Sequence, residues 1–175
     1  MGTKIRNLRP GFTLIEILVV VVIMGLTSAI ILPQLGSRDD IKTVSAARGL
    51  ASDLLYAQSR SIATGTMQYI VFSTSSSGKY DVMDSVAPAN IISHPVLHTP
   101  YEIVFGAAPL QSVSLNSVSF DGNTTIAFDT LGVPYSYQAS TQTLTPLTVG
   151  TIVLKAGSAT STVTVQPYSG EIKVQ

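Results

Sequence analysis

The longest feature of the hydrophobic pattern is a run over residues 12–32, in which Glu16 is the single formal charge. A helix of these 21 residues would rise about 31 Å, close to the roughly 30 Å thickness of a bilayer's hydrocarbon core. The run therefore predicts a helix that spans a membrane.

Four residues interrupt the aliphatic pattern at the end of this run and just after it: Gly25, Thr27, Ser28 and Pro33. Pro33 cannot donate a hydrogen bond to the carbonyl of Ala29, but the hydroxyls of Thr27 and Ser28 are near enough in sequence to satisfy freed backbone groups. We expect a kink or softened turn here, and not the end of a helix.

Beyond Gly36 the pattern becomes amphipathic, with one apolar face predicted to pack on a core. Its members recur at spacings of three and four: Val44, Ala47, Ala51, Leu54, Leu55, Gln58 and Ile62. The pattern fades before Gly65, a suitable residue to end a helix. The simplest prediction is one long helix over residues 12–64.

From residue 67 onward the period falls to two, and Gly, Pro and Ser separate runs rich in Val, Ile, Thr, Tyr and Phe. This pattern is typical of antiparallel strands. We predict strands over residues 67–73, 80–84, 102–105, 112–119, 124–128, 150–155, 162–165 and 171–174, with a loop over 85–100. The fold class is therefore α+β, a long N-terminal helix whose amphipathic half packs on a C-terminal antiparallel β-sheet domain. The predicted divisions are 1–11 (leader), 12–35 (transmembrane), 36–65 (amphipathic) and 66–175 (β-rich).

Charge and composition add a direction to this picture. Lys4, Arg6 and Arg9 give the segment up to Gly11 a charge of +3, and the rest of the chain carries −3. The positive-inside rule then places the N-terminus in the cytoplasm and the C-terminal domain outside, in the periplasm. Only 11% of the residues are charged, and there is no cysteine, which excludes disulfides and thiol chemistry.

A cleaved secretory signal is the alternative interpretation of the same N-terminus. Thr27-Ser28-Ala29 would serve as its cleavage site. Against it, the apolar run is longer than such signals usually are, and Glu16 lies inside it.

The residues Gly11-Phe12-Thr13-Leu14-Ile15-Glu16, after a basic leader and before an apolar helix, resemble the class III signal of type IV pilins and type II secretion pseudopilins. The resemblance implies that a prepilin peptidase cuts between Gly11 and Phe12, that the new amine of Phe12 is methylated, and that the helix is retained. It also implies that Glu16 meets the Phe12 amine of a neighbouring subunit during assembly.

The physical chemistry of Glu16 gives this implication a reason. A carboxylate inside an apolar helix is costly unless it is paired, and cleavage would create a cationic amine at Phe12. The alternative is an interfacial Glu16 that snorkels to the headgroups and has no role in assembly.

Further residues are similar to the minor pseudopilins called GspH/FimT. They are the helix part from Ala46-Ala47-Arg48 through Ala57-Gln58-Ser59-Arg60-Ser61-Ile62, the segment Ile126-Ala127-Phe128-Asp129-Thr130-Leu131-Gly132-Val133-Pro134, and the terminal Thr162-Val163-Thr164-Val165 followed by Ser169-Gly170-Glu171-Ile172-Lys173-Val174. This resemblance implies a structural subunit of a type IV pilus or a type II secretion pseudopilus, anchored in the inner membrane and assembled with other pilin-like subunits. The alternative is a minor pilin that binds DNA or a secreted cargo; Glu171 and the acidic mature chain do not favour DNA.

Other candidate sites are weak. His94 and His98 have the spacing of a helical metal site, but Pro95 and Pro100 exclude a regular helix, so we expect exposed loop histidines. Asp81 with Asp84, and Asp121 in a turn, could offer oxygen ligands to calcium but lack the spacing of a known calcium loop. No nucleophile elbow or phosphate loop is present. We therefore expect no enzyme, no cofactor and no metal.

Overall fold

The computed structural model describes residues 11–34 and 38–175, with side chains from 11 to 28 and from 38 onward. The described residues form two compact units, one up to residue 37 and one from Arg38 to Gln175. The predicted boundary between residues 35 and 36 lies outside the described residues.

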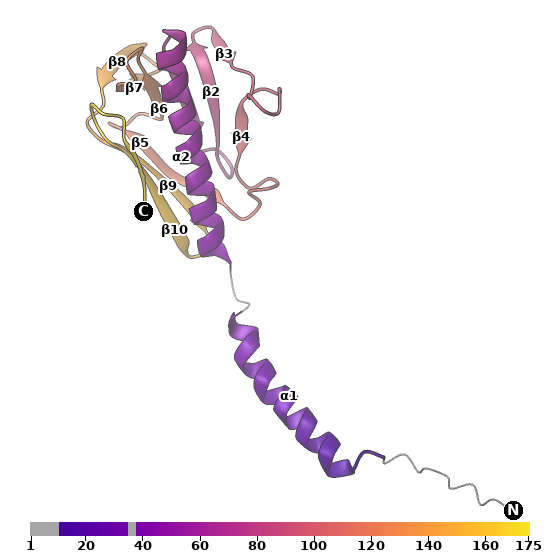
Figure 1. Ribbon diagram of the computed structural model, residues 1–175. Helices are drawn as coiled ribbons and strands as arrows, with labels where there is room; N and C mark the ends of the chain where they lie inside the picture. The colour runs from indigo at the N-terminus through magenta and orange to yellow at the C-terminus, as the bar shows by residue number, and fades with distance from the viewer. Residues whose placement is uncertain (1–10, 35–37) are drawn as a thin grey trace, which may run out of the picture. The chain divides into compact units, whose positions relative to one another are not determined.

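The first unit is a single helix, α1 (Leu14–Gln34) (Figure 1). Its large apolar side chains from Leu14 to Leu26 are all exposed, from 47% at Val20 to 84% at Leu14. Within the described residues, no helix is both long enough and apolar enough to cross a membrane.

The second helix, α2 (Asp39–Thr64), begins with a hydrogen bond from Lys42 N to Arg38 O. It ends at Gly65, which has the left-handed conformation (φ 64°) that a helix-ending glycine readily adopts. The structure thus describes two helices where the sequence predicted one over residues 12–64, and residues 35–37 between them are not described.

One stripe of α2 is buried, and it differs from the predicted face. Its members follow the helical period closely: Thr43, Ala46, Ala47, Leu50, Ala51, Leu54, Ala57 and Ser61. Leu55 and Ile62 were predicted to face the core but are 48% and 55% exposed. Each follows a buried residue directly, and one step along a helix turns the side chain by about 100°, out of a narrow stripe.

Two antiparallel sheets pack on α2. The seven-stranded sheet has the order β3-β2-β1-β6-β7-β8, with β4 also paired to β2, and the four-stranded sheet has the order β11-β10-β9-β5. Their strands are β1 (Gln68–Ser73), β2 (Lys79–Val86), β3 (Ala89–Ile91), β4 (Glu102–Val104), β5 (Ser114–Phe120), β6 (Thr125–Phe128), β7 (Pro134–Gln138), β8 (Thr143–Pro146), β9 (Gly150–Ala156), β10 (Ala159–Val165) and β11 (Ile172–Val174).

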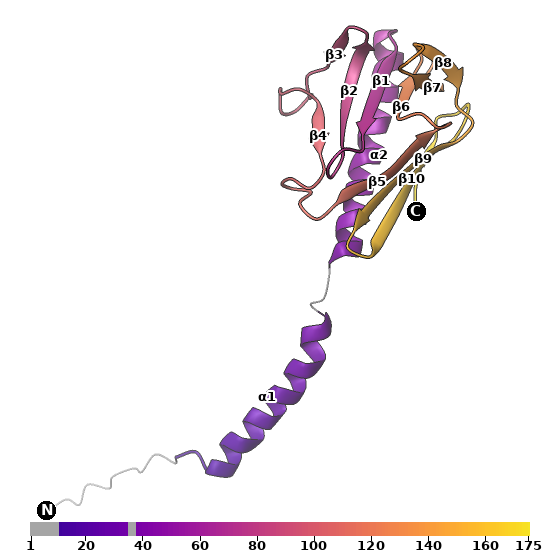
Figure 2. The ribbon, with the colours of Figure 1, turned by 180° about the vertical axis from the view of Figure 1, so that it is seen from behind.

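The two sheets lie on the same side of α2, which crosses in front of them in Figure 1 and behind them in Figure 2. The helix contacts β1 and β6 of the larger sheet and β9, β10 and β11 of the smaller one. The buried alanines of α2 let both sheets approach the helix closely. The α+β prediction is therefore confirmed, with two sheets in the β-rich part.

All eight predicted strands are present, but three others were missed. β3 lies inside the predicted loop 85–100, where a two-residue connection at Ala87-Pro88 lets Ala89 pair with Val86. β7 begins at Pro134, which pairs with Phe128. Proline is tolerated as the first residue of a strand, although its presence in a short run weakens the sequence signal.

The core of the second unit is complete within that unit. Ile70 is fully buried and lies opposite Val82 in β2 and Ile126 in β6, two further buried residues. Phe72 packs on Tyr80 and on Phe120, which brings the smaller sheet into the same core. None of the α1 residues whose side chains the structure describes belongs to this cluster.

Candidate functional site

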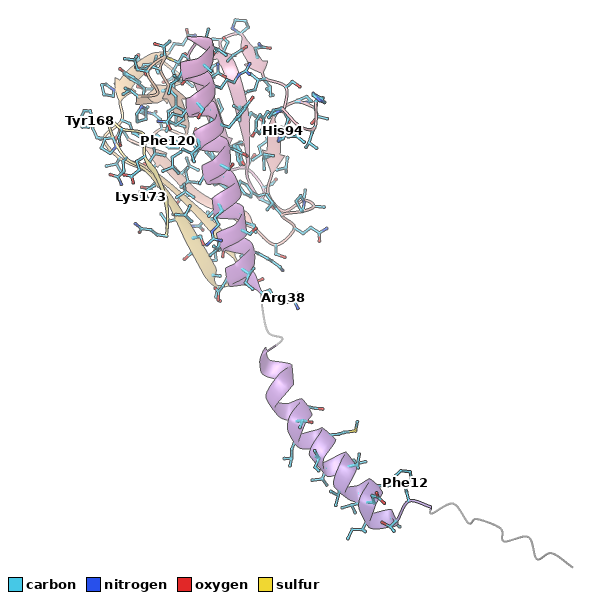
Figure 3. The ribbon with its side chains drawn as sticks, in the orientation of Figure 1. Phe12, Arg38, His94, Phe120, Tyr168 and Lys173 are labelled. Atoms are coloured by element: carbon cyan, nitrogen blue, oxygen red, sulfur yellow. The ribbon has the colours of Figure 1, made fainter. Side chains whose placement is uncertain are left out.

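The predicted cleavage site lies in an exposed, non-helical stretch at the start of α1. Gly11, Phe12 and Thr13 precede the helix, which begins at Leu14. Phe12 is 79% exposed, and no described atom lies within 4 Å of the position that a Cβ on Gly11 would take (Figure 3). The peptide bond between them is therefore open to a processing enzyme. The remaining leader residues, 1–10, lie outside the described residues.

Glu16 lies in the first turn of α1, three residues after Thr13, which caps the helix. Thr13 Oγ1 accepts a hydrogen bond from Glu16 N (3.3 Å), and Thr13 O accepts from Glu16 N (3.1 Å) and Ile17 N (3.3 Å). Thr-x-x-Glu is the spacing of a capping box, a signal that the sequence analysis missed. The position also suits a carboxylate, because the helix dipole is positive at this end.

α1 includes both Gly25 and Pro33, so neither ends the helix. The predicted role of the nearby hydroxyls is wrong. Thr27 Oγ1 donates to Ile23 O (2.9 Å) and Met24 O (3.1 Å), and Ser28 Oγ donates to Met24 O (2.7 Å). A hydroxyl in a helix reaches the carbonyl three or four residues before it, so neither group serves the carbonyl of Ala29. The kink itself stays a prediction.

Three segments that carry the resemblance to GspH/FimT meet at Gln58 of α2. Gln58 Nε2 donates to Gly132 O (2.9 Å) and to Ser169 O (3.3 Å). Gly170, at φ 65°, leaves no room for a side chain, since a Cβ there would contact Gln58 Nε2 and lie 3.0 Å from Gly132 O. We call Gln58, Gly132 and Gly170 the clamp. It joins the 129–133 turn and the 166–171 turn to the helix, so these residues have a structural role.

A second polar link joins the middle of α2 to the larger sheet. Asp53 Oδ2 accepts a hydrogen bond from the buried Tyr80 (2.6 Å), and Oδ1 accepts one from Tyr101 (3.0 Å). Burial raises the pKa of Asp53, and the two hydroxyls partly oppose that rise. Burial and the nearby carboxylate also raise the pKa of Tyr80. This link could not be predicted from the sequence, because the two tyrosines that bind Asp53 come from distant segments.

The histidines and aspartates that were considered as metal ligands are engaged elsewhere. His94 Nδ1 accepts hydrogen bonds from Val96 N and Leu97 N (both 3.2 Å), and its ring packs on Tyr101. His94 is thus half-buried and not exposed as predicted, whereas His98 is exposed. Within the described residues, no three His, Asp or Glu side chains are grouped so that they could hold a metal ion.

The acidic candidates are also occupied by protein groups. Asp81 pairs with Lys79 (3.2 Å), and Asp84 accepts a hydrogen bond from Asn90 (2.7 Å). Asp121 accepts from Thr148 N, Thr148 Oγ1 and Val149 N. Burial alone would raise the pKa of Asp121, but these hydrogen bonds outweigh it and lower the pKa.

Lys173, one of the few basic residues near the C-terminus, lies on β11 and pairs with Glu171 (3.1 Å) (Figure 3). This pairing reduces the positive charge that a phosphate backbone would meet there.

Comparison with known families now identifies the class of protein. The family model described as type II transport protein GspH matches residues 46–170, which include α2 from its second turn and almost all of the two sheets. The chain belongs to the GspH family, the minor pseudopilins of type II secretion. Members of this family are structural subunits and not enzymes, as the sequence indicated.

A second model, the prokaryotic N-terminal methylation motif, matches residues 6–32 and so includes Gly11, Phe12 and Glu16. This motif implies processing by a prepilin peptidase, anchoring in the inner membrane and assembly into a pseudopilus.

Among individual proteins, the type II secretion system core protein G of Pseudomonas aeruginosa is 52% identical over 44 residues. The match covers 25% of this chain and 31% of that protein, so the shared part is about a third of the relative's length. No solved structure matches the chain.

Proposed function

We propose that this chain is built into a type II secretion pseudopilus through α1, with Glu16 as the residue that aligns it with the next subunit. The observation that carries the proposal is the exposure of α1: every large apolar side chain from Phe12 to Leu26 is at least 47% exposed. A monomeric soluble domain rarely leaves such an apolar surface open. A bilayer first, and then the helices of neighbouring subunits, would cover it.

Glu16 is the one charged residue among the described residues of this surface. None of the hydrogen bonds or ion pairs found among the described residues uses its carboxylate, whereas Asp53 on α2 is held by two tyrosines. After cleavage the Phe12 amine is cationic near neutral pH. The Phe12 amine of the next subunit is then the proposed partner for Glu16.

The proposed orientation follows the charges on either side of α1. The leader carries three basic residues, Lys4, Arg6 and Arg9, and no acid. Directly after α1, in the run from Arg38 to Lys42, two basic residues are balanced by two acids. The N-terminus would lie in the cytoplasm and the second unit in the periplasm.

The test is Glu16→Gln, which removes the charge but keeps the size, beside Glu16→Ala. We expect both variants to be cleaved and to fractionate with the inner membrane as wild type does, because neither change alters the cleavage bond or reduces the apolarity of α1. Incorporation into sheared pseudopili should fall by tenfold or more, about 1.4 kcal/mol for one charge-assisted contact.

Glu171→Gln is the matched control, since it makes the same change at an exposed glutamate of the second unit and should leave incorporation unchanged. Wild-type incorporation of Glu16→Gln would refute the role of the charge. Loss of cleavage in the same variant would show instead that Glu16 acts in processing.

A further inference from the structure

The end of the second unit from which α2 starts carries a surface that the pseudopilus proposal does not explain. We define the basal surface by six residues: Arg38, Ile41, Lys42, Val44, Arg48 and Lys155. The first five belong to the start of α2, where Figure 3 labels Arg38. Lys155 lies near the turn between β9 and β10, which is beside the start of α2 in Figures 1 and 2. A Cβ on Gly157 of that turn would be 2.5 Å from Asp39 Oδ2.

The centre of the basal surface is apolar and hollowed. Ile41 is 70% exposed. It lines two adjoining hollows of about 300 and 500 Å³, the first closed by Pro109 and Leu110 and the second by Val44 and Arg48. An exposed isoleucine between shallow hollows offers apolar contact area without being part of the core.

The rim of this surface is basic, in contrast to the rest of the unit. Arg38, Lys42, Arg48 and Lys155 are all exposed, and with Asp39 and Asp40 they give this end a net charge of +2. Lys42 pairs with Asp39 at 3.5 Å. The remainder of the second unit carries −4, so its positive charge is concentrated at the end that follows α1.

The chain itself restricts what this end can meet. Only residues 35–37 separate Gln34 of α1 from Arg38, and a fully extended connection between those two residues spans at most about 15 Å. The headgroup layer on each side of a bilayer is about 5–8 Å thick. If α1 spans the membrane, as proposed above, the basal surface starts within about two headgroup layers of the hydrocarbon boundary.

We propose that, before the subunit joins the pseudopilus, its basal surface lies against the headgroups of the bilayer that holds α1. Ile41 reaches toward the hydrocarbon boundary, as apolar side chains of interfacial helices do, and the basic rim binds the phosphates of anionic lipids. The inference rests on the membrane placement in the proposed function. It adds that the periplasmic unit is held on the membrane surface and must be released for assembly.

The test uses the full chain, which has no cysteine and so accepts single labels cleanly. Nitroxide labels are placed separately at Ile41→Cys, Ile62→Cys and Val19→Cys, in vesicles of phosphatidylethanolamine and phosphatidylglycerol. Ile62 is the matched control, another exposed isoleucine at the opposite end of α2. Accessibility to oxygen relative to a nickel chelate reports immersion in lipid.

We expect Val19 to be immersed, Ile62 to be in water and Ile41 to lie between them. If Ile41 matches Ile62 while Val19 is immersed, the membrane contact of the basal surface is refuted and the membrane placement of α1 stands. If Val19 is also in water, both fail. Spin–spin broadening at Ile41 that grows with the protein-to-lipid ratio would assign the surface to a second copy and overturn the proposal.

The electrostatic part is tested by Arg48→Gln combined with Lys155→Gln, with Lys173→Gln as a control away from the basal surface. Each basic residue near an anionic surface changes a binding equilibrium by about fivefold, so the double variant should shift the ratio of immersed to released Ile41 label by up to about 25-fold. Lys173→Gln and wild type should agree. Equal spectra for wild type and the double variant, or no change when phosphatidylglycerol is replaced by phosphatidylcholine, would refute the role of the basic rim.

Discussion

α1 and α2 are helices of similar length, 21 and 26 residues, with opposite relations to the rest of the chain. α1 is apolar on all sides and buries none of its described large side chains, whereas α2 is polar on most sides and buries a single stripe of eight residues. A stripe serves a core inside the same chain, and an apolar surface all round a helix needs cover from outside. The two helices thus have different roles. α2 packs in the core of the chain's own fold, and α1 offers the apolar surface through which the chain is anchored.

Neighbouring leucines on α2 give the strongest test of this difference. Leu54 is fully buried and Leu55 is 48% exposed, so the same substitution probes the stripe and the surface one residue apart. Leu54→Ala should lower the free energy of unfolding by about 2–5 kcal/mol, and Leu55→Ala should change it by no more than about 0.5 kcal/mol.

The measurement is urea unfolding, followed by circular dichroism, of the fragment that begins at Arg38. The core contains no α1 residue from the part of that helix whose side chains are described, so this fragment is expected to fold cooperatively without α1. Similar losses for the two alanine variants would mean that the stripe of α2 has been placed wrongly. Failure of the wild-type fragment to fold would show that α1 contributes to the core after all.

Substitutions in the clamp test whether a polar residue of α2 also stabilises the fold. Gly170 (φ 65°) and Gly122 (φ 87°) are both left-handed, but only Gly170 has neighbours in the way of a Cβ. Gly122→Ala should cost about 1–2 kcal/mol for the backbone conformation alone. Gly170→Ala should cost a further 1–2 kcal/mol or so, because a Cβ displaces Gln58 from its two carbonyl acceptors.

Unfolding of the two variants, each combined with Gln58→Ala, gives the cleanest comparison. In the Gln58→Ala background, Gly170→Ala should lower the free energy of unfolding by less than it does in wild type. Gly122→Ala should lower it by the same amount in both backgrounds. If both costs are unaffected by Gln58→Ala, the clamp does not act as a unit.

The sequence revealed most of the strands and both helical patterns, since alternation and helical periodicity are local signals. It missed β3, β7 and β8, which are short, and β7 and β8 also contain prolines. It also misplaced Leu55 and Ile62. The direction of a narrow stripe depends on where the sheets lie, and the small residues Ala46 and Ala57 gave little hydrophobic signal although they are buried.

For the candidate site, the cleavage motif at Gly11 and Phe12 could be recognised because it is contiguous in sequence. The clamp could not, because Gln58, Gly132 and Gly170 come from three distant segments. The link from Asp53 to Tyr80 and Tyr101 was hidden for the same reason. The helix cap at Thr13 could also have been predicted, because Thr13 and Glu16 have the Thr-x-x-Glu spacing of a capping box.

The smallest expected effect concerns Asp53 and Asp121, whose hydrogen-bond partners lie inside the second unit. The proposed partner of Glu16, in contrast, belongs to another subunit. The pKa of Asp53 is raised by burial, so its charged form opposes folding, and wild type should gain stability relative to Asp53→Asn as the pH falls through the raised value. The pKa of Asp121 is lowered by hydrogen bonds that outweigh its slight burial. Its contribution is therefore present above the unfolded pKa of about 3.9 and is lost as the pH falls below it.

Urea unfolding of the Arg38 fragment between pH 3 and pH 7 measures both effects. The effect of the exposed Asp121 should be the smaller of the two, because solvent screens its interactions. The stability difference between wild type and variant should change with pH in opposite directions for Asp53→Asn and Asp121→Asn. Slopes of the same sign would contradict the roles given to burial at Asp53 and to hydrogen bonding at Asp121. Both substitutions remove one negative charge from the same cooperative unit, so a general effect of net charge would give slopes of the same sign. Opposite slopes would therefore report the local environment of each acid.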